Sequence, residues 1–145
     1  MSFLDSLQTS ATGLSAQRFR MNLISSNLAN INTTRTQQGG PYKRKDAVFE
    51  AKPQQPSFQE ALSNQVAPEN TDVEVTQIVE DDRPPILKYD PGHPDADADG
   101  YIRLPNINVV EEMVNMLSAS RSYEANITAL RSTKDMASDA LDIGK

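Results

Sequence analysis

The sequence lacks cysteine altogether and confines proline to its middle: none of the 145 residues is cysteine, and all nine prolines lie between Pro41 and Pro105. Without cysteine the chain cannot form disulfides, zinc thiolate sites or a thiol nucleophile. It also has no run near the roughly 18 consecutive apolar residues that span a membrane. Because proline interrupts helices, only the two ends are free to form long helices. Three parts are therefore expected, with bounds 1–34, 35–107 and 108–145.

Basic clusters and strong hydrophobicity are scarce as well. The net charge is -6 and the one basic run is Lys43–Lys45, so a nucleic-acid partner is not expected. The hydrophobic share of 37% and the mean hydropathy of -0.56 are low for a self-contained globule, which favours a chain that packs on neighbours. The first residues show neither a basic start nor an apolar core segment, so we expect no cleaved secretory signal peptide.

Apolar residues recur at helical spacing in the N-terminal segment 3–31. Four of them stand seven residues apart, namely Leu7, Leu14, Met21 and Leu28. This spacing predicts a helix of about 45 Å that packs lengthwise on another helix. From Ser6 to Gln17 there is no charge, although a solvated helix normally carries charges on its outer face. That favours a helix packed on several sides; an ordinary surface helix with a Ser/Thr-rich face is the alternative.

The C-terminal segment predicts a second long helix with a defined start. Asn108 followed by Glu111 resembles a capping box, and Pro105 lies just upstream. One stripe with alternating spacings of four and three runs through Val109, Met113, Met116, Ser120, Tyr123, Ile127, Leu130, Lys134, Ala137 and Leu141. Val110, Val114, Leu117 and Ala119 widen it. The expected fold class is mainly α with a small β region, in which the two terminal helices pair as a coiled coil.

The middle part reads as short strands and irregular chain. The segment 45–51 predicts one strand, and 73–79 and 86–89 predict two more. The acidic, proline-containing stretch between the last two suggests that they form a hairpin with each other. For 53–70 a short helix and a mobile insertion are both open, and we favour the insertion.

The segment 95–100 needs a test as a metal site, because three aspartates stand at alternate positions before a glycine. Asp95, Asp97, Asp99 and Gly100 match the start of a calcium-binding EF-hand loop. However, Asn106 stands where a bidentate glutamate is required, and nearby prolines exclude the flanking helices. A solvated acidic turn is therefore expected and a weak calcium site is the alternative.

His93 is the one histidine of the chain, and it cannot build a zinc site by itself. The chain does contain the residue types of a Ser-His-Asp triad, so a small hydrolase that uses His93 is a further alternative. No nucleophile elbow accompanies the plentiful serines, however. We expect no enzyme, with no catalytic residue, no cofactor and no metal site.

Several stretches resemble one family in order along nearly the whole chain. The segment 26–34 is similar to the N-terminal signature of bacterial flagellar rod and hook proteins. The segments 39–45, 89–97, 105–113 and 118–126 resemble the proximal rod proteins within that group. The motif residues that we single out are Asn27, Leu28, Ala29, Asn30, Gly39, Gly40, Pro41, Tyr42, Asp90, Pro91, Gly92, His93 and Pro94.

The resemblance implies a structural subunit that polymerises into the hollow rod of the flagellar basal body in the periplasm. Its partners would be copies of itself and other rod subunits. Export would use the flagellar type III apparatus, where Phe3 and Leu7 resemble the short element that docks at the export gate. The subunit-packing residues would be Leu7, Leu14, Met21, Leu28, Val109, Met113, Met116, Tyr123, Ile127, Leu130 and Leu141.

Overall fold

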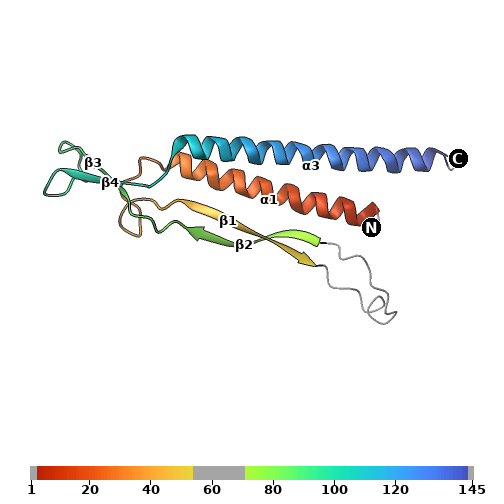
Figure 1. Ribbon diagram of the computed structural model, residues 1–145, viewed down its shortest axis with the longest axis horizontal. Helices are drawn as coiled ribbons and strands as arrows, with labels where there is room; N and C mark the ends of the chain where they lie inside the picture. Colours follow the sequence, from red (N-terminus) through yellow and green to blue (C-terminus); the bar gives the residue numbers. More distant parts are fainter. Residues whose placement is uncertain (1–2, 54–70, 144–145) are drawn as a thin grey trace.

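Two long helices lie side by side and dominate the computed structural model, which describes residues 3–53 and 71–143 (Figure 1). The elements in chain order are α1 (Phe3–Ala29), β1 (Lys45–Pro53), β2 (Thr71–Glu80), β3 (Ile86–Tyr89), β4 (Tyr101–Leu104) and α3 (Val109–Ile143). This confirms the expected fold class of a mainly α chain with a small β region. The choice between a short helix and an insertion for 53–70 concerns residues outside the described part of the chain, apart from Pro53 at the end of β1.

The helices α1 and α3 pair as the sequence predicts, and they run antiparallel along most of the length of α1 (Figure 1). Small residues let them approach closely: a Cβ added to Gly13 would lie 3.1 Å from Nδ2 of Asn126. Ala16, Ile24 and Ala119 are buried at the helix pair or beside it. Because these side chains are mostly small, the apolar core is thin and its packing depends on close backbone contact.

The start of α3 is capped as the sequence predicts. Oδ1 of Asn108 accepts hydrogen bonds from the backbone N–H of Val110 at 3.0 Å and of Glu111 at 3.5 Å. These bonds satisfy amides that have no partner inside the helix. The acidic first turn also complements the helix dipole.

The strands form two separate antiparallel pairs rather than the hairpin expected from 73–79 and 86–89. The strand β2 pairs with β1 in a register that runs from Lys45 opposite Glu80 to Pro53 opposite Thr71. The strand β3 pairs with β4, which the sequence analysis missed. The paired strands are similar in length: β1 and β2 have nine and ten residues, and β3 and β4 have four each.

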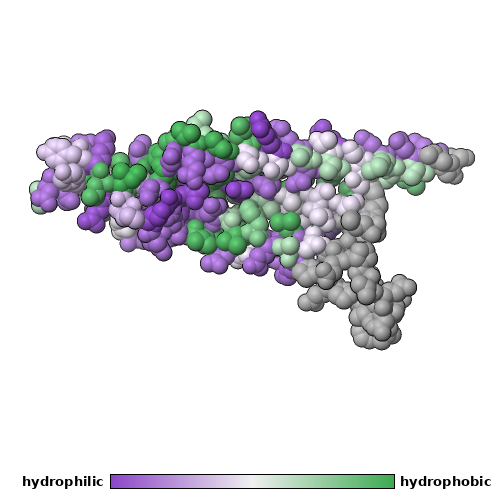
Figure 2. Space-filling view, in the orientation of Figure 1, coloured by the Kyte–Doolittle hydropathy of each residue, from purple (hydrophilic) through white to green (hydrophobic). Residues whose placement is uncertain are grey.

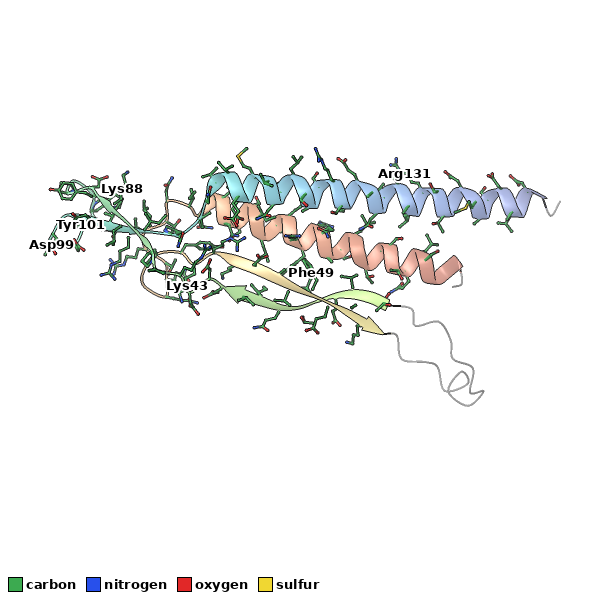
Figure 3. All side chains as sticks on the ribbon, viewed as in Figure 1. Lys43, Phe49, Lys88, Asp99, Tyr101 and Arg131 are labelled. Atoms are coloured by element: carbon green, nitrogen blue, oxygen red, sulfur yellow. The ribbon has the colours of Figure 1, made fainter. Side chains whose placement is uncertain are left out.

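The β1–β2 ribbon lies along α1 on the side away from α3, so α1 is placed between them (Figure 1). Phe49 of β1 projects toward α1 (Figure 3). The β3–β4 hairpin extends beyond the end of the helix pair at which α3 begins (Figure 1). Within the described part of the chain, no helix combines the length and the apolar character needed to cross a membrane.

Candidate functional site

A buried polar cluster joins α1, the chain before β1, and α3. We call it the polar junction; its side chains are those of Asn27, Tyr42, Arg44 and Glu112. Asn27 and Glu112 are each only 1% exposed. Nδ2 of Asn27 donates to Oε2 of Glu112 at 3.1 Å and to the carbonyl oxygen of Lys45 at 2.9 Å. Its Oδ1 accepts from the Tyr42 hydroxyl and from the backbone N–H of Lys45, both at 3.0 Å.

The charge of Glu112 is balanced inside the junction. Nε of Arg44 donates to Oε1 of Glu112 at 2.7 Å, and Nη1 of Arg44 lies 3.3 Å from Oδ2 of Asp46. Burial of the Arg44 guanidinium acts against its charged form. The hydrogen bond and charge of Glu112, with Asp46 and Glu111, outweigh this and keep the pKa of Arg44 above its usual value. A buried carboxylate is tolerated only with such partners, so the junction holds its members together.

The junction brings two of the motif segments into contact. Asn27 lies in the first and Tyr42 in the second, and the two side chains meet although they are 15 residues apart. Between them, Gly39 and Gly40 have φ angles of 86° and 76°, which favour glycine over other residues. Asn30 directly follows α1. Its Nδ2 donates to the carbonyl oxygen of Ser26, and its Oδ1 accepts from the hydroxyl of Thr33. Leu28 is half-buried, and Ala29 is exposed.

The sequence analysis assigned no role to Arg44 or to Glu112. The sequence does contain a pattern that points to burial of Glu112. On α3, positions 112, 116, 119, 123, 126 and 130 form a second stripe with alternating spacings of four and three. A carboxylate at the first position of that stripe must be buried when the stripe faces α1. It then requires a cation, which the one basic run supplies.

The acidic segment 95–100 forms the turn that connects β3 to β4. Oδ1 of Asp97 accepts from the backbone N–H of Tyr101 at 2.9 Å and of Asp99 at 3.2 Å. Asp95 accepts from the hydroxyl of Thr34 at 2.7 Å, and its own N–H donates to Nδ1 of His93 at 3.1 Å. Across residues 3–53 and 71–143, no three acidic or histidine side chains are placed to share a metal ion. Oδ1 of Asp97 thus binds the backbone of its own turn.

The remaining motif residues support this turn. Asp90 accepts from the backbone N–H of His93 through its carbonyl oxygen and donates its own N–H to Gly100. Gly100 is buried with a φ of 81°, and an added Cβ would lie 3.0 Å from the ring of Tyr89 and 3.2 Å from Pro91. Pro91, Gly92 and Pro94 are exposed. This motif therefore shapes a tight turn over the Tyr89–Tyr101 pair, whose ring centroids lie 5.3 Å apart.

The first turns of α3 carry an exposed apolar surface. We call it the α3 stripe; it consists of Val110, Met113, Val114 and Leu117, which are 54–68% exposed. Their spacing of three and four places them on one side of the helix, opposite the buried Glu112 and Ala119. Figure 2 shows hydrophobic atoms over this end of α3 and on the neighbouring hairpin, where Ile86, Leu87 and Tyr89 are also exposed. Such contiguous patches are typical of interaction surfaces.

The residues predicted to pack between subunits divide into two groups in the single chain. Those half-buried here are Leu7, Leu14, Met21, Leu28, Met116, Tyr123, Ile127 and Leu130. Those exposed are Val109, Met113 and Leu141. Contact of either group with another subunit stays a prediction. Of the two residues proposed for export, Phe3 begins α1 and Leu7 is half-buried one turn later.

Comparisons with known proteins agree with these features. The family described as "Flagella basal body rod protein" matches residues 7–37, and "Flagellar basal body rod FlgEFG protein C-terminal" matches residues 98–143. The chain is 45% identical to the flagellar basal-body rod protein FlgC of Bacillus subtilis over 100% of both chains. It is 44% identical to FlgC of Borreliella burgdorferi over 99% of this chain and 98% of the relative.

A more distant relative shows the same extent of similarity. FlgC of Salmonella typhimurium is 39% identical over 100% of both chains. The two family matches cover α1 with the turn that follows it and β4 with α3, so they contain Asn27 and Glu112 of the polar junction. The chain therefore belongs to the FlgC family of flagellar basal-body rod proteins.

Proposed function

We propose that the chain is a structural subunit of the basal-body rod that polymerises, with copies of itself and other rod subunits, into a hollow drive shaft across the periplasm. Family membership supports the rod and its location in the flagellar basal body. The α3 stripe is the observation that carries the assembly role, because it leaves large apolar side chains without cover in one chain.

The energetics favour burial of the α3 stripe against another subunit. Fully burying one side chain of this size contributes about 1.5–3 kcal/mol. Four neighbouring side chains that are more than half exposed therefore offer several kcal/mol to an interface. Charged side chains flank the stripe at Glu111 and Arg121 but do not interrupt its centre, which is the usual arrangement of an apolar interface core and a polar rim.

We also infer that the role is structural and not catalytic. In the polar junction the Arg44 guanidinium is directed at the buried carboxylate of Glu112, at 2.7 Å. His93, the candidate for a catalytic base, accepts a hydrogen bond from the backbone N–H of Asp95 through Nδ1. These hydrogen bonds and ion pairs stabilise the fold, and a structural role agrees with membership of a family of rod proteins.

A substitution in the α3 stripe tests the assembly role. Val114→Asp should strongly reduce motility on soft agar and remove the chain from isolated basal bodies, because burial of an unpaired carboxylate costs several kcal/mol. Ala129→Asp is the matched control, since Ala129 is an exposed residue of the same helix outside the stripe. It should remain motile. Normal rods with Val114→Asp would exclude the α3 stripe as a subunit interface.

We further propose that Phe3 and Leu7 dock the chain at the type III export gate. An apolar pair four residues apart forms a short recognition element at the start of α1. The competing explanation is that both residues only pack within the helix pair. The two explanations differ in the step at which a variant fails.

The variant Phe3→Ala distinguishes export from packing. If Phe3 docks at the gate, the chain should accumulate in the cytoplasm and disappear from the exported fraction. Ser2→Ala serves as a neighbouring control. Fractionation followed by immunoblotting measures both. Export at the normal level together with failed rod assembly would assign Phe3 to packing alone.

A further inference from the structure

A groove lies between α1 and β2 on a different part of the molecule from the α3 stripe. It has a volume of about 500 Å³. Its lining includes Ala11, Ser15 and Phe19 from α1 and Val73 and Val75 from β2. Apolar groups therefore cover much of its wall, and the short side chains of Ala11 and Ser15 leave room for another helix to approach.

The groove matches the α3 stripe in polarity. Most of its α1 wall belongs to the stretch from Ser6 to Gln17, which has no charged residue, and the remaining wall residue of α1 is the apolar Phe19. The apolar stripe could be buried there without leaving a wall charge unpaired, which an interface core must avoid. Glu74 lies at the rim, where it pairs with Lys52 at 2.9 Å. Both members of that pair are more than half exposed, so it is weak and Arg121 of an arriving α3 can share the carboxylate.

The stripe and the groove cannot meet within one chain. The stripe faces away from α1, as the burial of Glu112 and Ala119 on the opposite side of α3 requires. Figure 3 shows side chains projecting from α3 on the side away from α1, Arg131 among them. The groove lies instead between α1 and the ribbon. A contact between these two surfaces must therefore join two copies.

We propose that the α3 stripe of one copy inserts into the α1–β2 groove of a second copy. This inference rests on the proposed rod-subunit function, because a rod must grow by contacts that repeat. A contact of the stripe with the same stripe on a second copy would close into a dimer. A contact between two different surfaces is heterologous, so it can continue into an open helical assembly.

The contact also fixes an offset between copies along the helix direction. Gly13, near the centre of the α1 wall, lies level with Asn126 of α3 in the same chain. The stripe is centred near Met113, 13 residues before Asn126 on α3, which corresponds to an axial offset of about 20 Å. If neighbouring copies keep the same orientation, each is shifted along α3 by this amount.

Cysteine crosslinking tests the contact, and the natural absence of cysteine gives a clean background. Two differently tagged full-length copies, one with Met113→Cys and one with Ser15→Cys, would be produced together in flagellated cells that lack the native copy. A short thiol-specific crosslinker should give a product that carries both tags. The control replaces Ser15→Cys by Ser25→Cys, at an exposed serine outside the groove on the same helix, and should give at least tenfold less product.

A second variant keeps the test informative if crosslinking geometry is poor. Ser15→Trp should fill the groove and reduce assembly of the chain at least tenfold, whereas Ser25→Trp should leave it near normal. Equal assembly of the two variants would overturn the proposal.

The outcomes separate this proposal from the function on which it rests. Motile cells in which Met113→Cys crosslinks to itself, to a different rod subunit or to nothing would overturn the stripe-to-groove contact and leave the rod-subunit role intact. Normal assembly of Val114→Asp would instead contradict the assembly role of the stripe itself. A product with both tags, absent from the Ser25→Cys control, supports the proposal.

Discussion

At the scale of single residues, Asn27 determines how three parts of the chain meet. Its amide donates to two acceptors and accepts from two donors, and it is 1% exposed. Asparagine suits this position because one planar group supplies both donors and acceptors. Aspartate, although nearly the same size, cannot donate. It would also place a second carboxylate 3.1 Å from that of Glu112.

The first residue-scale prediction follows from this geometry. Asn27→Asp should reduce rod assembly and motility strongly, because an unsatisfied buried group costs about 1–3 kcal/mol and more if it is charged. A loss of about 2 kcal/mol corresponds to a change of more than tenfold in the ratio of folded to unfolded chain. Recovery of the chain in isolated basal bodies measures the effect.

A second substitution gives the control for the polar junction. In the double variant Asn27→Asp with Glu112→Gln, the new glutamine amide can donate to the new aspartate, and the net charge of the cluster is unchanged. Assembly should recover in part. If the double variant were as defective as the two single changes combined, direct contact between positions 27 and 112 would not explain the loss.

At the scale of elements, the helices were predictable from the sequence and the strand pairing was not. Helical spacing and the Asn108 cap identify α1 and α3, because these signals are local. The pairing of β1 with β2 joins strands that are far apart in sequence. The residues between them carry no turn signal strong enough to predict it. The strand Tyr101–Leu104 was overlooked because only four residues separate Gly100 from Pro105.

The face that each helix turns inward was only partly predictable. The expected α3 register contains Tyr123 and Ile127, which are half-buried, but also Met113 and Leu141, which are exposed in the single chain. Two apolar stripes overlap on this helix, and spacing alone does not tell which one faces α1. The buried pair of Arg44 and Glu112 decides it.

The element-scale prediction compares two sides of α3. Ile127→Asp should destabilise the α1–α3 pair by roughly 2 kcal/mol or more, since it removes apolar packing and places a carboxylate beside α1. Ser132→Asp, at an exposed position of the same helix, should change stability by no more than about 0.5 kcal/mol. The yield of each variant in isolated basal bodies checks this. Similar yields would mean that the α1-facing side of α3 contributes little.

At the scale of the whole molecule, the chain is long and has little apolar core. Among the described residues the buried hydrophobic side chains are Ala16, Ile24, Ile102, Ile107 and Ala119, whereas many large apolar side chains are exposed. The low hydrophobic share indicated this imbalance before the fold was known. The balance of surface and core suits a subunit whose stability increases when neighbours cover it.

The polar junction also bears on how the chain matures. Asn27 and Glu112 are 85 residues apart in sequence, yet their side chains are in direct contact. Synthesis proceeds from the N-terminus, so α1 is complete long before its carboxylate partner exists. A product that stops short of residue 112 cannot close the junction and lacks all of α3 beyond its first turn. Because Glu112 belongs to α3, the buried surroundings of Asn27 are completed only after synthesis has passed residue 112.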